Sequence, residues 1–311
     1  MGGVEAPGGA EIVTAEPARW PKGHGPFEGT VDADGMLWGR GALDMKGMGM
    51  LETEVMRWLK RTNAKLDRDV ILLAVADEEV NSAGMRDAVE HHWAELGCTQ
   101  SVNEGGLGLR DAIVDGQTVF PISVGEKGVL WLKMIADGPP GHGSTPVEGR
   151  APGKLLAAMD RIRARKDRPR LDPELYEVLY DVGEEAGGLT GFIMTKHALV
   201  DAFVVDRFMA KPLTRAIITD TVNLTGFAGA HEPNVVPSEV WAQYDIRLLP
   251  GTTPNDVIAE LERMTADIPG IRFEVMEHAM LAAVSDWDDP FYRALVHQAV
   301  AVAEAHGEKR V

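Results

Sequence analysis

The sequence predicts an α/β fold in which a mostly parallel sheet carries helices on both faces, with a smaller α+β domain inserted into it. Three observations lead to this fold. Helical apolar stripes alternate with a short, continuous apolar run at residues 70–76 in the first half of the chain. From about residue 125 the strands become longer and mostly suit antiparallel pairing. An amphipathic helical stripe then returns after Pro290.

The first half of the chain reads as helix, strand and helix. Apolar residues recur at helical spacing over residues 48–59 and again over residues 85–96. The run 70–76 between them is apolar at every position and bounded by charge, which is typical of a strand buried on both faces. Alternation of this kind predicts a parallel sheet covered by helices on both sides. Ligands of such sheets bind at the carboxyl ends of the strands.

The second half predicts a small α+β domain. Strands are expected at residues 128–136, 215–224, 239–248 and 271–275, and helices over 155–162 and 257–264. Residues 161–206 are rich in charge and glycine and predict a loop-and-helix insertion. We therefore expect a discontinuous catalytic domain made of residues 1–121 and 279–311, and an α+β domain made of residues 122–278.

Composition excludes several classes of partner. The 311 residues carry a formal net charge of −17, which argues against nucleic acid or an anionic membrane as a partner. The single cysteine, Cys98, rules out an internal disulfide and suits a reducing, cytoplasmic location. No apolar stretch approaches the ~18 residues of a membrane span. The N-terminus has neither the basic start nor the apolar core of a signal peptide, and reads as a flexible leader.

Four acidic residues on three short motifs carry the chemistry. Asp44 lies in WGRGALDMKG (38–47), Glu78 and Glu79 in ADEEV (76–80), and Glu104 in NEGG (103–106). Together they could supply oxygen ligands for two divalent metals and leave one carboxylate free as a base. Each also has a simpler interpretation: a helix N-cap for Asp44, a solvated acidic turn for the glutamate pair, and a loop residue for Glu104.

The order of five motifs resembles the di-zinc exopeptidase and deacylase family, which includes aminoacylase, carboxypeptidase G, acetylornithine deacetylase and succinyl-diaminopimelate desuccinylase. The three acidic motifs are followed by GHGSTP (141–146), then by NVVP (234–237) with DIRLLPG (245–251). The resemblance covers nearly the whole chain, from about Glu16 to the end.

The resemblance implies a role for each motif residue. Asp44 would bridge two zinc ions, Glu79 would bind one and Glu104 the other, and Glu78 would be the general base; cobalt or manganese could replace zinc. His142, on the smaller domain, would steady the oxyanion in the partner subunit of a homodimer. Asn234 and Arg247 would hold the substrate, a small peptide or an N-acyl amino acid. The alternative interpretations are a polar loop tip for His142 and a strand-face ion pair for Arg247.

The chain departs from the family pattern at both ends. The family's early His-x-Asp motif aligns with Gly9 and Glu11, so its histidine is absent, and the chain ends at Val311 before the late motifs of the family. We therefore expect a truncated chain with weak zinc binding and little hydrolysis. His24, His91 and His92 stay open as substitute ligands. Two functions remain: a metal-dependent amidohydrolase that cleaves next to a free carboxylate, and a non-catalytic homologue or fragment that retains the dimerisation domain.

Overall fold

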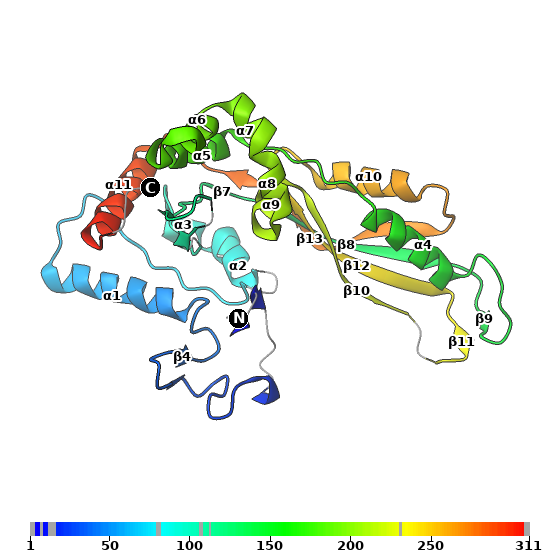
Figure 1. Cartoon of the computed structure of the whole chain (residues 1–311). Coiled ribbons are helices and arrows are strands. Elements are labelled where there is room, and N and C mark those ends of the chain that lie inside the picture. The colour runs from blue at the N-terminus through cyan, green and yellow to red at the C-terminus, as the bar shows by residue number, and fades with distance from the viewer. Residues whose placement is uncertain are drawn as a thin grey trace. The chain divides into compact units, whose positions relative to one another are not determined.

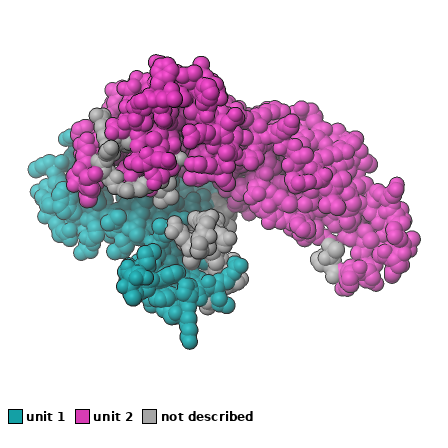
Figure 2. Space-filling model, in the orientation of Figure 1, with its two compact units in different colours: residues 1–105 teal, residues 106–311 magenta. Residues whose placement is uncertain are grey.

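The computed structural model describes residues 4–6, 9–11, 17–78, 82–105, 108–111, 113–229 and 232–307. The chain divides into two compact units, residues 1–105 and residues 106–311 (Figure 2). The division groups residues by the contacts that they make with one another. The discontinuous catalytic domain made of residues 1–121 and 279–311 stays a prediction.

The described residues of unit 1 form three α-helices and two small antiparallel strand pairs. Figure 1 shows α1, α2 and α3. The helices form where the apolar spacing predicts them, except that a break at His92 divides the second in two. The strand pairs are β1 (Val4–Ala6) with β2 (Gly9–Glu11) and β3 (Thr30–Val31) with β4 (Leu37–Trp38). The helices are α1 (Lys46–Thr62), α2 (Ala83–His91) and α3 (Trp93–Leu96), and a short 3-10 turn covers Pro17–Arg19.

The predicted buried strand at residues 70–76 is wrong. The segment has no strand partner among the described residues, and its apolar side chains are exposed, Val70 by 46% and Ile71 by 49%. The stripe of α1 is likewise uncovered, with Leu51 70% exposed. A strand that is apolar at every position needs neighbours on both edges and layers on both faces. The described part of unit 1 does not supply them.

The main sheet belongs to unit 2 and is antiparallel. It contains β8 (Gly128–Asp137), β10 (Thr221–Ala228), β12 (Glu239–Leu248) and β13 (Ile271–Met280) in the order β10-β12-β8-β13. The register places Leu248 opposite Gly128 and Glu239 opposite Asp137. Every strand pair among the described residues is antiparallel, so the mixed α/β composition is observed and the predicted parallel sheet is not confirmed.

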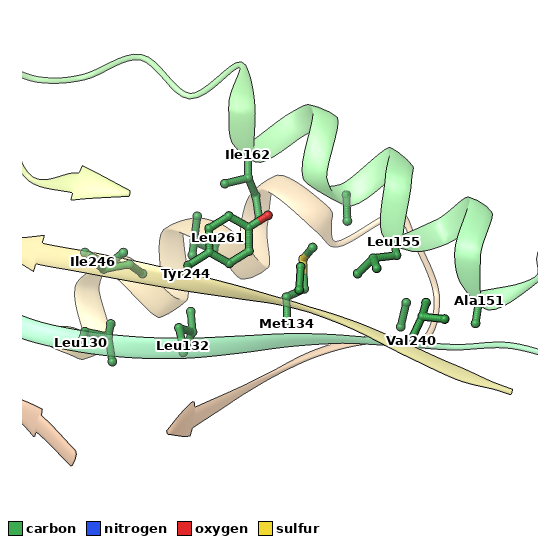
Figure 3. Close-up of a cluster of buried hydrophobic side chains, with 14 of the residues drawn as sticks. Leu130, Leu132, Met134, Ala151, Leu155, Ile162, Val240, Tyr244, Ile246 and Leu261 are labelled. Atoms are coloured by element: carbon green, nitrogen blue, oxygen red, sulfur yellow. The ribbon is translucent and has the colours of Figure 1, made fainter. Parts of the chain in front are cut away.

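One face of this sheet is buried beneath two helices. Side chains alternate along β12, so that its even-numbered residues point inward. They pack with those of β8 against α4 (Ala151–Arg163) and α10 (Pro254–Thr265) (Figure 3). The labelled members of this core are Leu130, Leu132, Met134, Ala151, Leu155, Ile162, Val240, Tyr244, Ile246 and Leu261. Burial also raises the pKa of Tyr244 to about 12.

A helical segment with its own hydrophobic core follows α4 in the sequence and precedes β10. It comprises α5 (Pro173–Ala186), α6 (Gly188–Met194), α7 (His197–Phe203), α8 (Val205–Ala210) and α9 (Pro212–Ile218). Its core includes Leu179, Val182, Val200, Phe208 and Ile218. The predicted strand 215–224 is therefore wrong in its first half, since the helix continues to Ile218 and the strand begins at Thr221.

A half-buried lysine fixes the end of α9. The Nζ of Lys127 donates to the carbonyls of Ala216, at 2.9 Å, and of Thr219, at 2.7 Å. These are carbonyls at the end of a helix, where intrahelical partners run out. Burial lowers the pKa of Lys127. The residues Ile217, Ile218 and Thr219 favour a strand by side-chain type, and this tertiary contact helps to overrule that preference.

Three short strand pairs and a last helix complete unit 2. The pairs are β5 (Leu109–Arg110) with β6 (Thr118–Val119), β7 (Gly125–Glu126) with β14 (Ala283–Val284), and β9 (Gly141–His142) with β11 (Val235–Val236). Helix α11 (Pro290–Ala305) begins at Asp289, whose carboxylate accepts the N–H of Phe291 at 2.7 Å. Across the described residues no single helix is long and apolar enough to cross a membrane, and only the bent pair Gly188–Met194 with His197–Ala210 has the length and composition to do so.

Candidate active site

Three of the predicted acidic residues are described, and all lie in unit 1. Asp44 is exposed in the turn before α1, with a cis peptide bond to Met45. It is not the N-cap of that helix, because the capping position is Met45. Glu78 is exposed after the segment 70–76, and its carbonyl accepts the hydroxyl of Ser82 at 3.3 Å. Glu104 is half-buried at a bend.

The fourth acidic residue, Glu79, lies outside the described residues. Among the side chains that are described, no three His, Cys, Asp or Glu are grouped so that they could hold a metal ion. This includes His24, His91 and His92. His24 contacts the hydroxyl of Thr30, and His91 contacts the carboxylate of Asp87. The predicted metal ligands therefore stay a prediction.

In unit 2 the structure brings His142 and Asn234 together, although 92 residues separate them in the sequence. His142 pairs with Val235 across β9 and β11, and the N–H of Gly143 donates to the carbonyl of Asn234 at 2.7 Å. Both side chains are exposed at this tip. The tip lies at the far end of the main sheet from α9 (Figure 1).

Sequence reasoning missed the residues that hold this tip. The Arg150 guanidinium donates to the Thr145 carbonyl at 2.9 Å and to the His142 carbonyl at 3.5 Å. A Cβ on Gly141 would lie only 2.5 Å from that guanidinium, so any larger residue would have to displace the Arg150 side chain. Ser144 contacts the imidazole of His142. The GHGST run, in which two glycines flank the histidine, was the available signal for this loop.

Arg247 lies on the outward face of β12, where it forms an ion pair. Its Nε and Nη2 donate to the two carboxylate oxygens of Asp245, at 2.7 and 3.1 Å. This strand-face pair is the alternative interpretation that the sequence left open for Arg247. Lys127 lies near enough to Arg247 for each charge to act on the other.

The structure separates Arg247 from His142. Arg247 is opposite Val129 at the start of β8, whereas His142 follows shortly after Asp137 at the end of that strand. Asp137 lies eight residue steps along the strand from Val129, which corresponds to roughly 27 Å. One copy of unit 2 therefore cannot place both side chains on a single small substrate.

The family model for peptidase family M20/M25/M40 matches residues 12–310. The chain belongs to this family. Aminoacylase-1 of Sus scrofa is 26% identical over 283 residues, covering 90% of this chain and 58% of the relative. The N-fatty-acyl-amino acid synthase/hydrolase PM20D1 of Homo sapiens is 28% identical over 271 residues, covering 85% of this chain and 53% of the relative. This M20 chain thus spans little more than half the length of these relatives.

A solved structure supports the fold of this M20 member. The M20 family metallo-carboxypeptidase Sso-CP2 from Sulfolobus solfataricus matches with a TM-score of 0.60 at 21% identity, covering 93% of this chain and 66% of that structure. Membership confirms the resemblance inferred from the five motifs.

Proposed function

We propose that this M20 chain is a metal-dependent hydrolase that cleaves a peptide or N-acyl amide bond next to a free carboxylate. The observation that carries the proposal is the family match across residues 12–310, which contains all five motifs in order. Two relatives are named for aminoacylase and for N-fatty-acyl-amino acid hydrolysis, and both names describe an amide between an acyl group and an amino acid.

The acidic residues of unit 1 have the chemistry for a divalent cation. Asp44, Glu79 and Glu104 offer only carboxylate oxygens, which suit manganese or magnesium as well as zinc. When bound, the metal would polarise the scissile carbonyl and acidify the attacking water. The absence of the family's imidazole at Gly9 predicts that zinc binds more weakly than in a complete site.

We assign the role of the general base, which takes the proton of the attacking water, to Glu78. It neighbours the proposed ligand Glu79 and is exposed, so water reaches its carboxylate. A carboxylate left outside the metal shell can take the proton of the attacking water and pass it to the leaving amine. Glutamine at this position would have the same shape but could not accept that proton.

The residues of unit 2 would bind the substrate, and they require two subunits. Arg247 suits a terminal carboxylate because its planar fork matches two oxygens. His142 and Asn234 present polar groups at the opposite end of β8. If both ends act on one substrate, the second must come from a partner copy, so we propose a homodimer through the smaller domain.

A mixing experiment tests this arrangement. His142→Ala and Arg247→Ala variants should each be inactive alone. In a mixed dimer both mutations fall in one site and leave the other intact, so part of the activity should return on mixing. No recovery, in mixtures shown by sedimentation to contain mixed dimers, would contradict a site shared between two subunits.

A non-catalytic homologue is the second candidate. It is favoured by the missing histidine at Gly9 and by the lack of a three-residue metal group among the described side chains. Metal analysis separates the two functions. We expect the purified chain, dialysed with zinc, cobalt or manganese, to retain metal and to hydrolyse N-acyl amino acids or dipeptides slowly in a chelator-sensitive way. A metal-free, inactive chain under all three conditions would favour the non-catalytic role.

A further inference from the structure

The imidazole of His142 is held by Ser144 through one ring nitrogen. The backbone N–H of Ser144 donates to Nδ1 of His142 at 3.2 Å, and the Ser144 hydroxyl lies 2.7 Å from the same nitrogen. The loop that carries both residues is fixed at its base by the Arg150 guanidinium and by the pairing of β9 with β11.

These contacts decide the tautomer of the ring. The hydrogen of a peptide N–H lies in the peptide plane and cannot rotate away, so the nitrogen that receives it must present a lone pair. Nδ1 of His142 is therefore unprotonated, and the hydroxyl of Ser144 is the donor in its own contact. In a neutral imidazole the remaining proton then lies on Nε2.

We infer that Ser144 is a positioning residue that holds His142 in the Nε2–H form and directs that N–H outward. The inference rests on the proposed function, in which His142 steadies the negative charge that develops on the scissile carbonyl oxygen. That task requires a hydrogen-bond donor already in place. The other tautomer would turn a lone pair toward the oxyanion and oppose it.

The tautomer can be read directly in the 311-residue chain. Long-range proton–nitrogen spectra of ¹⁵N-labelled imidazoles distinguish protonated from unprotonated ring nitrogens, and His142→Gln identifies the signals of His142. We expect the Nε2–H form at about pH 8.5, where an ordinary imidazole is neutral. Ser144→Ala keeps the backbone donor and loses the hydroxyl. The ratio of Nε2–H to Nδ1–H should then fall roughly fivefold, the scale of one hydrogen bond.

Two variants complete the test. Ser144→Thr retains a hydroxyl and should restore the wild-type ratio. Thr145→Ala removes the neighbouring hydroxyl, which makes no hydrogen bond to His142, and should leave the ratio unchanged. A wild-type ratio in Ser144→Ala, or an Nδ1–H form in the wild type, would overturn the inference.

Activity provides a separate readout. If the proposed function holds, Ser144→Ala should lower kcat with little change in KM, and Ser144→Thr should recover it. If the tautomer responds as expected but no variant, nor the wild type, hydrolyses an N-acyl amino acid, the proposed function fails while the assignment of Ser144 stands. If activity is present but insensitive to Ser144→Ala despite the tautomer shift, the positioning role is overturned.

Discussion

On β12 the Nε and Nη2 of Arg247 both donate to the carboxylate of Asp245, through hydrogen bonds of 2.7 and 3.1 Å. The pair lies on a partly exposed strand face, where such ion pairs contribute only about 0–1 kcal/mol to stability. A carboxylate of the substrate would need the same planar fork. If Arg247 binds the substrate as proposed, the substrate carboxylate must compete with Asp245, and this competition should be visible in KM.

Replacing Arg247 by lysine tests this role. Arg247→Lys keeps the charge but loses the fork, so KM for a substrate with a free carboxylate should rise about tenfold with little change in kcat. The same substrate as a carboxamide should not respond. Arg272→Lys is the matched control, because Arg272 is another partly exposed strand arginine paired with carboxylates. An equal rise in KM for both variants would contradict the assignment.

Helix α10 provides a test of stability and of its pH dependence. Thr253 accepts the N–H of Asp256, and Asp256 accepts the N–H and hydroxyl of Thr253. Loss of such a cap costs about 1 kcal/mol, so Thr253→Ala should lower the Tm of unit 2 while Thr253→Ser should not. Thermal melts followed by circular dichroism measure both.

The same cap predicts that part of the free energy of unfolding is lost in acid. The hydroxyl and backbone N–H of Thr253 lower the pKa of Asp256 below its ordinary value of 3.8. The folded state then binds fewer protons than the unfolded state, so this stabilisation is complete above about pH 4 and is lost as pH falls through the lowered pKa. Melts of Asp256→Asn should therefore differ from wild type above pH 4 and converge with it in stronger acid. A constant difference down to pH 2 would exclude this linkage.

The regular elements of unit 2 could be predicted from the sequence because the spacing of their apolar residues fits only one type of secondary structure. Residues 239–248 alternate in burial along the whole strand and form β12 at the predicted bounds. The strand predicted at 215–224 is wrong only in its first half, where α9 continues to Ile218. The contact of Lys127 with the end of α9 spans 89 residues of sequence and helps to favour the helix. Tertiary contacts of this kind leave no local pattern.

The candidate site, too, could be predicted from the sequence only in part. Motif order supplies the candidate residues, since each motif is a short local run. It could not show that Arg247 and His142 lie at opposite ends of β8, because that follows from strand register. Nor could it show that Ser144 holds His142, which depends on the shape of a loop.

The exposed segment 70–76 predicts an unusual tolerance to charge. Val70 and Leu72 are 46% and 39% exposed and have no strand neighbour in the described structure. Lysine at either position should change the free energy of unfolding by no more than about 0.5 kcal/mol and should reduce binding of an apolar dye. In contrast, Leu132→Ala in the main core should cost about 2–5 kcal/mol. Comparable losses in the lysine variants would show that the segment is buried in solution.

Restoring the missing imidazole should strengthen metal binding. Gly9→His with Glu11→Asp introduces the family's early His-x-Asp motif at the positions that the sequence predicts for it, just before residue 12, where the family match begins. Zinc affinity, measured by calorimetry, should rise on the order of tenfold to a hundredfold. A change of that size is already typical when a residue that only hydrogen-bonds to a metal ligand is mutated. Gly2→His is a control for a histidine added elsewhere in the N-terminal segment. Equal affinity in both variants would reject the alignment of Gly9 with the family's ligand.

The most direct test of the proposed function combines metal content and turnover in Glu78→Gln. Both the wild type and the variant are saturated with zinc or manganese, their bound metal is measured, and the same samples hydrolyse an N-acyl amino acid. The proposal predicts equal metal in the two proteins and a turnover about 10²–10⁴-fold lower in Glu78→Gln, because glutamine cannot take the proton of water. Equal turnover in both proteins, or no bound metal in either, would contradict it.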